Sequence, residues 1–208
     1  MENKASIQDE VSKYYNEKIE MYGQTPKGVD WNGEESQFLR FFQLSKLIPK
    51  NEFFTLNDIG CGYGSYYDYL SLNYKLFDYE GIDISPSMIS SALDRNKCER
   101  NLNFILSNTP TRIADYSVAS GIFNVKQDRS DSEWWEYLIE TLAILDKYSK
   151  KGFSFNCLTS FSDKEKMKDY LYYANPMKIF EYCKINFSRN VSLFHDYDLY
   201  EFTLIVRK

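Results

Sequence analysis

The stretch LNDIGCGYG, residues 56–64, decides the fold. It ends a short apolar run, FFTLNDIG at 53–60, which predicts a buried strand, and a helical pattern follows it. Gly60, Gly62 and Gly64 would let the backbone turn sharply and let a ligand approach the main chain. A tight strand-to-helix turn without a ligand would explain the three glycines equally well. The loop therefore indicates a nucleotide site only if other residues support it.

An acidic residue supplies that support at the end of the next predicted strand. The segment YEGIDIS, residues 79–85, places Asp83 23 residues after Gly60. Acids that bind ribose lie roughly 20 residues after the glycine loop in nucleotide-binding folds. A carboxylate here can accept hydrogen bonds from both ribose hydroxyls. The alternative role for Asp83, a helix cap, is already filled by Ser85, with Pro86 at the first helical position.

Strands and helices alternate along most of the chain. Predicted helices cover 6–22, 34–47, 65–74, a segment from Pro86, 131–148 with Ser132 as its cap, a segment from Asp163 and another from Asn175-Pro176. Predicted strands cover 53–60, 79–85, 102–106, 116–123 and 152–158, and a hairpin of 190–195 and 199–208 ends the chain. This alternation predicts an α/β three-layer sandwich with a mostly parallel sheet. We expect a helical N-terminal lid at 1–50 and a main domain at 51–208, which together form one structural unit.

Composition excludes several classes of protein. The 208 residues carry a formal net charge of −5 and no long run of Lys or Arg, so a nucleic-acid partner is not expected. No apolar run is long enough to cross a membrane, and the polar N-terminus resembles no targeting segment, which predicts a cytoplasmic protein. A single histidine and scattered cysteines, Cys61, Cys98, Cys157 and Cys183, predict no metal site and no disulfide framework.

LNDIGCGYG followed by EGIDIS resembles the first motif and its acidic successor in class I S-adenosylmethionine (SAM)-dependent methyltransferases. Their pattern has an acid two residues before GxGxG, as Asp58 is here, whereas NAD-binding proteins more often show GxGxxG without that acid. The terminal hairpin is also similar to the end of the seven-stranded methyltransferase sheet. The resemblance covers roughly residues 35–208. It implies the strand order 3-2-1-4-5-7-6 with an antiparallel C-terminal hairpin, and SAM as the cofactor with S-adenosylhomocysteine (SAH) as the product.

The resemblance also implies which residues would bind the cofactor. Asp58 would meet its amino group, Asp83 the ribose hydroxyls and Ile84 the adenine. After the third strand the family often has an Asp; this chain has Asn108, which we take as the substitute. Further predicted binding residues come from the glycine loop, from the end of the fourth strand and from the lid: Gly60, Cys61, Gly62, Tyr63, Gly64, Gly121, Ile122, Phe123, Trp31 and Arg40.

Residues for the methyl-transfer step are less constrained by the sequence. His195 is the only histidine and lies beside Asp196, which makes it a candidate general base, or equally a histidine satisfied within the hairpin. Tyr173 is a second candidate, in a segment that often caps the acceptor pocket in this family. Packing is the alternative role for Tyr173, as it is for Trp31, and Arg40 could equally be a surface residue.

The sequence leaves three functional hypotheses. The first is a bacterial methyltransferase for a small-molecule acceptor with an oxygen or nitrogen nucleophile, similar in layout to enzymes of surface-polysaccharide pathways, including those for O-methyl phosphoramidate capsule groups. The second is a methyltransferase for a protein or nucleic acid. The third is a non-catalytic scaffold that binds SAM. The oligomeric state is left open between a monomer and a homodimer.

Overall fold

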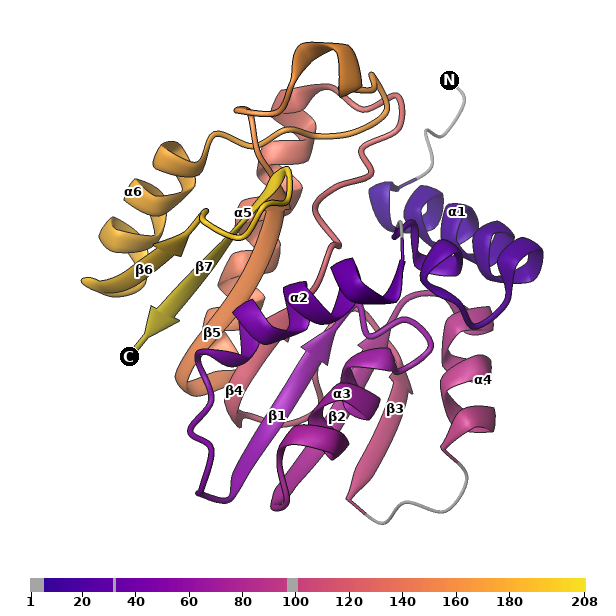
Figure 1. The fold of residues 1–208 in the computed structure, drawn as a ribbon, viewed down its shortest axis with the longest axis vertical. Coiled ribbons are helices and arrows are strands. Elements are labelled where there is room, and N and C mark those ends of the chain that lie inside the picture. The colour runs from indigo at the N-terminus through magenta and orange to yellow at the C-terminus, as the bar shows by residue number, and fades with distance from the viewer. Residues whose placement is uncertain (1–5, 32, 97–100) are drawn as a thin grey trace.

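The structure is a computed structural model that describes residues 6–31, 33–96 and 101–208 (Figure 1). Within these residues one seven-stranded sheet has the order β3-β2-β1-β4-β5-β7-β6, which confirms the predicted topology. All neighbouring strands from β3 to β5 are parallel, and β7 is antiparallel to both β5 and β6. The strands are β1 (Phe54–Ile59), β2 (Phe77–Asp83), β3 (Leu102–Leu106), β4 (Ala114–Ala119), β5 (Ser149–Leu158), β6 (Asn190–Phe194) and β7 (Glu201–Arg207).

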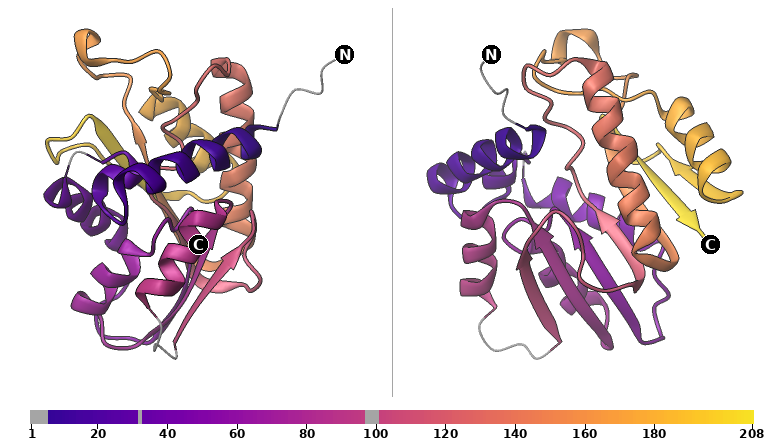
Figure 2. Two further views of the ribbon diagram at one scale, coloured as in Figure 1. Left: turned by 90° about the vertical axis from the view of Figure 1, so that its right-hand side faces the viewer. Right: turned by 180° about the vertical axis from the view of Figure 1, so that it is seen from behind.

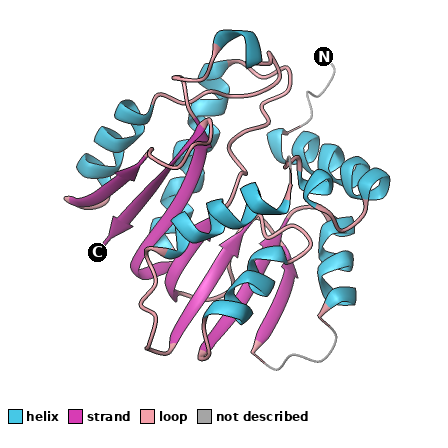
Figure 3. Ribbon diagram, viewed as in Figure 1, coloured by secondary structure: helices cyan, strands magenta, loops and turns pink. Residues whose placement is uncertain are grey.

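Helices cover both faces of the sheet and one of its ends (Figures 2 and 3). The α-helices are α1 (Ile7–Tyr22), α2 (Glu34–Ser45), α3 (Ser65–Asn73), α4 (Pro86–Arg95), α5 (Asp131–Lys147) and α6 (Pro176–Asn186). Short 3-10 turns η1 (Pro26–Val29) and η2 (Lys164–Lys166) follow α1 and β5. Helix α1 lies beyond the end of the sheet to which the arrowheads of β1, β2 and β3 point (Figure 1). No helix among the described residues is long and apolar enough to span a membrane.

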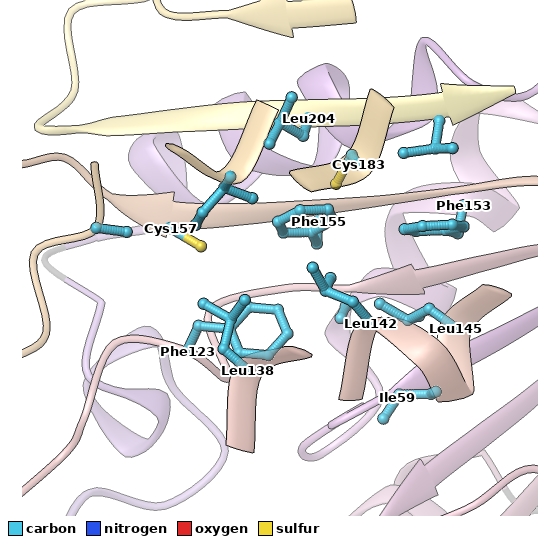
Figure 4. Packing of buried hydrophobic residues seen from close by; sticks show 14 of the residues in the cluster. Ile59, Phe123, Leu138, Leu142, Leu145, Phe153, Phe155, Cys157, Cys183 and Leu204 are labelled. Atoms are coloured by element: carbon cyan, nitrogen blue, oxygen red, sulfur yellow. The ribbon is translucent and has the colours of Figure 1, made fainter. Parts of the chain in front are cut away.

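Two apolar clusters hold the layers together. One lies between α5, α6 and the sheet and includes Leu138, Leu142, Phe153 and Phe155 (Figure 4). The other lies on the opposite face and is rich in aromatic residues, with Phe41 of α2 and Tyr66 of α3 at a ring separation of 5.0 Å. Their burial removes a large apolar area from water, which is the main stabilising contribution to a fold of this kind.

The connection from β3 to β4 is short. Residues 107–113 run behind the sheet without a helix, so the rear of β1, β2 and β3 carries no helix (Figure 2, right). On this face the connection itself is bonded to β2. Thr111 donates to the buried Glu80 carboxylate from its backbone nitrogen at 2.8 Å and from its hydroxyl at 2.7 Å, and Arg112 donates to the carbonyl of Asp78 at 3.0 Å. These bonds satisfy polar groups that would otherwise be buried without partners.

The bounds of several elements differ from the predicted ones by up to three residues, and three predictions were wrong beyond that or in kind. The fourth strand ends at Ala119 and not at 123, because Gly121 turns the chain away with a left-handed φ of 76°. The helix predicted from Asp163 is only the turn η2, since the following backbone forms bridges from Leu171 to Val125 and from Ala174 to Thr159. The cap of α5 is Ser130 and not Ser132: Ser130 and Glu133 form a capping box. Ser85 and Asn175 cap α4 and α6 as expected.

Candidate functional site

A cavity opens at the carboxyl ends of β1, β2 and β4. Its volume is about 1000 Å³, which includes space open to solvent. Helix α1 and the η1 segment contribute to its wall, and so does α5. Ten of the residues that the sequence predicted for the cofactor line it: Trp31, Asp58, Gly60, Cys61, Gly62, Asp83, Ile84, Asn108, Gly121 and Ile122. Crevices at the carboxyl ends of parallel strands are the usual binding places in open α/β sheets.

The glycine loop leaves β1 in a conformation that side chains oppose. Gly60 and Gly62 have φ values of 77° and 55°, in the left-handed region. A Cβ atom on Gly60 would lie 2.1 Å from Cγ2 of Ile122, so Ile122 would have to move to admit a side chain there. The backbone nitrogens of Gly60 and Cys61 both donate to the carbonyl of Ile82, at 2.7 and 3.1 Å. These bonds hold the start of the loop against the end of β2.

Gly60→Ala is expected to lower the free energy of unfolding by roughly 1–3 kcal/mol, because alanine combines an unfavourable φ with a clash against Ile122. The loss should appear as a melting temperature several degrees lower in calorimetry. Gly33→Ala is the matched control, since a Cβ on Gly33 meets nothing within 4 Å. An equal melting temperature for both variants would contradict this account of the loop.

Asp58 is a buried carboxylate with an incomplete set of partners. One oxygen, Oδ2, accepts a hydrogen bond from the Tyr79 hydroxyl, while Oδ1 has no partner among the described side chains and backbone. Burial raises the pKa of Asp58 to about 7; the Tyr79 hydroxyl opposes this shift and the nearby Asp83 charge adds to it. A buried acceptor without a partner is costly. A donor or cation that entered the cavity would supply the partner that Oδ1 of Asp58 lacks.

Asp83 ends β2 and faces the same cavity. Its Oδ2 accepts from the backbone nitrogen of Gly62 at 2.9 Å, and its Oδ1 accepts from the nitrogen of Ser85 at 2.8 Å. Burial raises the pKa of Asp83, and the backbone donors limit that shift. An ionised carboxylate offers about four acceptor positions, so both oxygens can still accept hydrogen bonds from a ligand. The structure thus joins the glycine loop and the acid through one hydrogen bond.

A set of buried contacts lies behind the cavity wall near the end of β4. Gly121 donates its backbone N–H to Oδ1 of Asn156 at 2.9 Å, and Asn156 donates to Oε2 of Glu201 at 2.6 Å. Arg40 meets Glu201 with two bonds of 2.8 Å each, and the Arg40 guanidinium lies 3.9 Å from the ring centre of Trp31. Arg40 does not line the cavity and already has a carboxylate partner, so its predicted role in cofactor binding gains no support.

Helix α1 contributes residues that sequence reasoning missed. Gln8 accepts a bond from Asn108 at 3.0 Å, and Ser12 donates to the carbonyl of Ile84 at 2.9 Å. Both line the cavity, together with Val11 and Tyr15 of the same helix. Val11 and Tyr15 lie four residues apart, on one face of this helix, and this helical spacing of apolar residues in the sequence was the available signal. It indicated a buried face but not what that face covers.

Other predicted residues lie away from the cavity. His195 is exposed near the rings of Phe161 and Phe202, and the Tyr173 hydroxyl accepts from the backbone nitrogen of Lys168 at 3.0 Å. The structure gives no support for a catalytic role of either. Tyr63, Gly64 and Phe123 also lie outside the lining. Asn32, which belongs to the lid predicted at 1–50, and Cys98 fall outside the described residues.

The glycine loop, the two acids and the sheet order together define a Rossmann-like methyltransferase site, and comparisons with known proteins agree. Residues 57–123 match the family model "Methyltransferase domain". The chain is 52% identical over 163 residues to "Putative methyltransferase Rv1506c" of Mycobacterium tuberculosis, an alignment that covers 78% of this chain and 98% of that protein. The chain therefore belongs to this methyltransferase family.

Solved structures share the fold over nearly the whole chain. The "DhpI-SAM-HEP complex" has a TM-score of 0.66 at 15% identity, with 99% of this chain and 100% of that chain covered. Magnesium protoporphyrin IX methyltransferase (ChlM) from Synechocystis PCC 6803, solved with bound SAH, has a TM-score of 0.66 at 12% identity, with 98% and 100% covered. The fold, the family and the site together make this chain a class I SAM-dependent methyltransferase.

Proposed function

We propose that this enzyme transfers the methyl group of SAM to a small-molecule acceptor through an oxygen or nitrogen nucleophile. The observation that carries the proposal is the Asp58 carboxylate, whose Oδ1 is buried without a partner beside the glycine loop. The ammonium group of the cofactor would supply the missing partner. Asp83 would hold the ribose hydroxyls, and Ile84 and Asn108 would meet the adenine.

The protein would also align the acceptor with the methyl group of the cofactor and exclude water from the cavity. SAM supplies an electrophilic methyl group on a sulfonium when it is bound. Alignment of an acceptor with that group can contribute about 7–11 kcal/mol to lowering the barrier. Helix α1 and Trp31 cover the cavity and would keep water out during transfer. The lid role of residues 1–50 is part of this proposal.

A small acceptor fits the site better than a macromolecule. The cavity is walled by α1 and η1, and the sequence carries a net charge of −5 and no long run of Lys or Arg, the pattern that would favour a nucleic-acid substrate. Magnesium protoporphyrin IX methyltransferase, one of the structural neighbours, also acts on a small molecule by its name. We further propose a cytoplasmic enzyme, monomeric or homodimeric, in bacterial surface-polysaccharide biosynthesis, with O-methyl phosphoramidate capsule groups as one product class.

Calorimetric titration with SAM, SAH and NAD tests the cofactor part of the proposal. SAM and SAH should bind and raise the melting temperature, whereas NAD should do neither, since a ligand stabilises the state that it binds. The acceptor part is tested with methyl-labelled SAM and a panel of sugar, phosphoramidate, amine and oligonucleotide substrates. Label transfer only to the oligonucleotide would overturn the small-molecule assignment, and no binding of SAM or SAH would overturn the whole proposal.

A bidentate ion pair joins α1 to the segment after β4. Arg129 donates to both oxygens of Glu10, at 2.7 and 2.8 Å, and also reaches Glu133 at 3.3 Å. Arg129→Met should therefore loosen α1 over the cavity and raise the dissociation rate of SAH about tenfold, the effect of losing roughly 1.4 kcal/mol. Stopped-flow displacement of SAH measures this rate. Lys126→Met is the control, because Lys126 contacts Asp131 and the Arg129 carbonyl but not α1; equal rates in both variants would contradict the role of the ion pair.

A further inference from the structure

We propose that Arg40 and Glu201 are positioning residues that hold Trp31 against Gly121 and so fix the wall of the cofactor cavity at the end of β4. The inference rests on the proposed function, because it assigns a task to residues behind that cofactor site. Five segments meet here: the loop before α2, α2 itself, the turn after β4, and the neighbouring strands β5 and β7.

The contacts form a closed ring. Trp31 touches Gly121 so closely that a Cβ on Gly121 would lie 2.3 Å from Cζ2 of the indole. Gly121 is bonded to Asn156, Asn156 to Glu201, and Glu201 to Arg40. The Arg40 guanidinium then returns to the Trp31 ring at 3.9 Å. Trp31 and Gly121 face the cavity, whereas the other three members lie behind its wall.

The polar members of this ring are buried. Glu201 is 1% exposed, Arg40 6% and Asn156 fully buried. Desolvation makes buried ion pairs costly, and apolar replacements of similar size are often as stable or more stable. The bidentate geometry does, however, fix orientation, because the planar guanidinium can face the carboxylate in few ways. The guanidinium also presents its face to the indole, which favours one ring position. The ring of contacts therefore specifies the place of Trp31 more than it adds stability.

A double variant separates positioning from stability. Arg40→Met with Glu201→Leu removes both charges together and leaves no unpaired ion. We expect its melting temperature to fall less than that of Glu201→Leu alone, because no buried charge is left without a partner, although the Asn156 amide loses its acceptor. We expect the dissociation constant for SAH to rise about tenfold, since Trp31 no longer has a fixed position. The single variant Glu201→Leu leaves Arg40 buried and unpaired, so it should lose both stability and SAH affinity.

Fluorine NMR of protein labelled with 5-fluorotryptophan reports Trp31 directly. The Trp31 signal, assigned with Trp31→Phe, should be single and sharp in the unchanged protein and broadened or split in the double variant. The signals of Trp134 and Trp135 on α5 should stay unchanged. Lys151→Met is the matched control; it removes the Lys151–Asp115 ion pair at the opposite end of the sheet and should leave both SAH affinity and the Trp31 signal as they were.

The outcomes distinguish this inference from the proposed function. A stable double variant with unchanged SAH affinity and an unchanged Trp31 signal would overturn the positioning role while the cofactor site stands. Failure of the unchanged protein to bind SAH would instead overturn the proposed function. If the double variant is unstable, Trp31→Phe is tested alone. Its Arg40–Glu201 ion pair is intact, and the inference predicts that it binds SAH more weakly than the unchanged protein. An unaltered affinity for SAH would overturn the inference.

Discussion

Asp83→Ala is expected to weaken SAM and SAH binding by about 100-fold or more, the largest loss for any single residue of the site. A hydrogen bond to a charged group is worth about 1.5–3 kcal/mol, and Asp83 is proposed to bind two ribose hydroxyls. The substitution also releases Gly62, whose nitrogen donates to Oδ2 at 2.9 Å, so the glycine loop loses its anchor. Isothermal titration at pH 7.5 measures the change.

Asp78→Ala is the control for that experiment. Asp78 lies on the same strand as Asp83 but near its opposite end, away from the cavity. Its variant should bind SAH with the affinity of the unchanged protein. A loss of SAH affinity of tenfold or less for Asp83→Ala would show that the carboxylate does not hold the ribose. Its role would then be to hold the glycine loop in shape.

The second large effect is a dependence of cofactor binding on pH that Asp58 controls. The pKa of Asp58 is raised to about 7 by burial, so the carboxyl is largely protonated below that pH. A cofactor ammonium beside it would favour the carboxylate and release a proton on binding. SAH affinity should therefore fall as pH drops from 7 to 5.5, by up to about tenfold per unit. The α-amino group titrates near 8, so it stays protonated over this range.

Asp58→Asn separates this effect from other titrations. The variant should bind SAH more weakly at pH 7.5, with a loss of about 10-fold to 100-fold, because a charged hydrogen bond is replaced by a neutral one. It should also show nearly flat affinity between pH 5.5 and 7. Titrations in buffers of different ionisation enthalpy should show proton release for the unchanged protein and none for the variant. Equal pH profiles for both proteins would exclude Asp58 from the ammonium site.

The same carboxyl affects the stability of the free protein with a defined sign. Its folded pKa of about 7 lies above the ordinary value of 3.8, so between these values the folded state binds more protons than the unfolded state. The contribution of Asp58 to stability is then full below pH 3.8 and is lost as pH rises through 7. Urea unfolding at pH 5 and pH 7.5 should show a smaller pH-dependent loss in Asp58→Asn than in the unchanged protein.

The sequence predicted the elements that local patterns determine. The apolar run before Gly60, the spacing to Asp83 and the Ser85-Pro86 start of α4 each depend on a few neighbouring residues, and the structure confirms the elements that they predicted. The sheet order came from the resemblance of the motifs to a known family. The end of the fourth strand was wrong because Gly121 and Ile122 continue an apolar pattern although the backbone has already turned.

Long-range pairing explains what the sequence missed at the site. Arg40 and Glu201 are 161 residues apart, and nothing local marks Glu201 as the partner that keeps Arg40 from a ligand. Gln8 and Ser12 lie on α1. The spacing of its apolar residues predicted that one face is buried, but not that this face lies over the ends of the strands. His195 was predicted as a candidate general base because it is the only histidine in the sequence. That property of the composition does not tell where the side chain lies.

The short connection from β3 to β4 links the carboxyl end of the sheet, where the cavity lies, to the rear face of the sheet. Residues 107–113 must pass from the carboxyl end of β3 to the start of β4, and extended chain covers at most about 3.3–3.6 Å per residue. The segment is fixed at one end by the bond from Asn108 to Gln8 of α1 and near the other by the bonds from Thr111 to Glu80. We expect a change at Thr111 to displace Asn108, so this segment connects the rear surface of the sheet to the part of the cavity that we propose for the adenine.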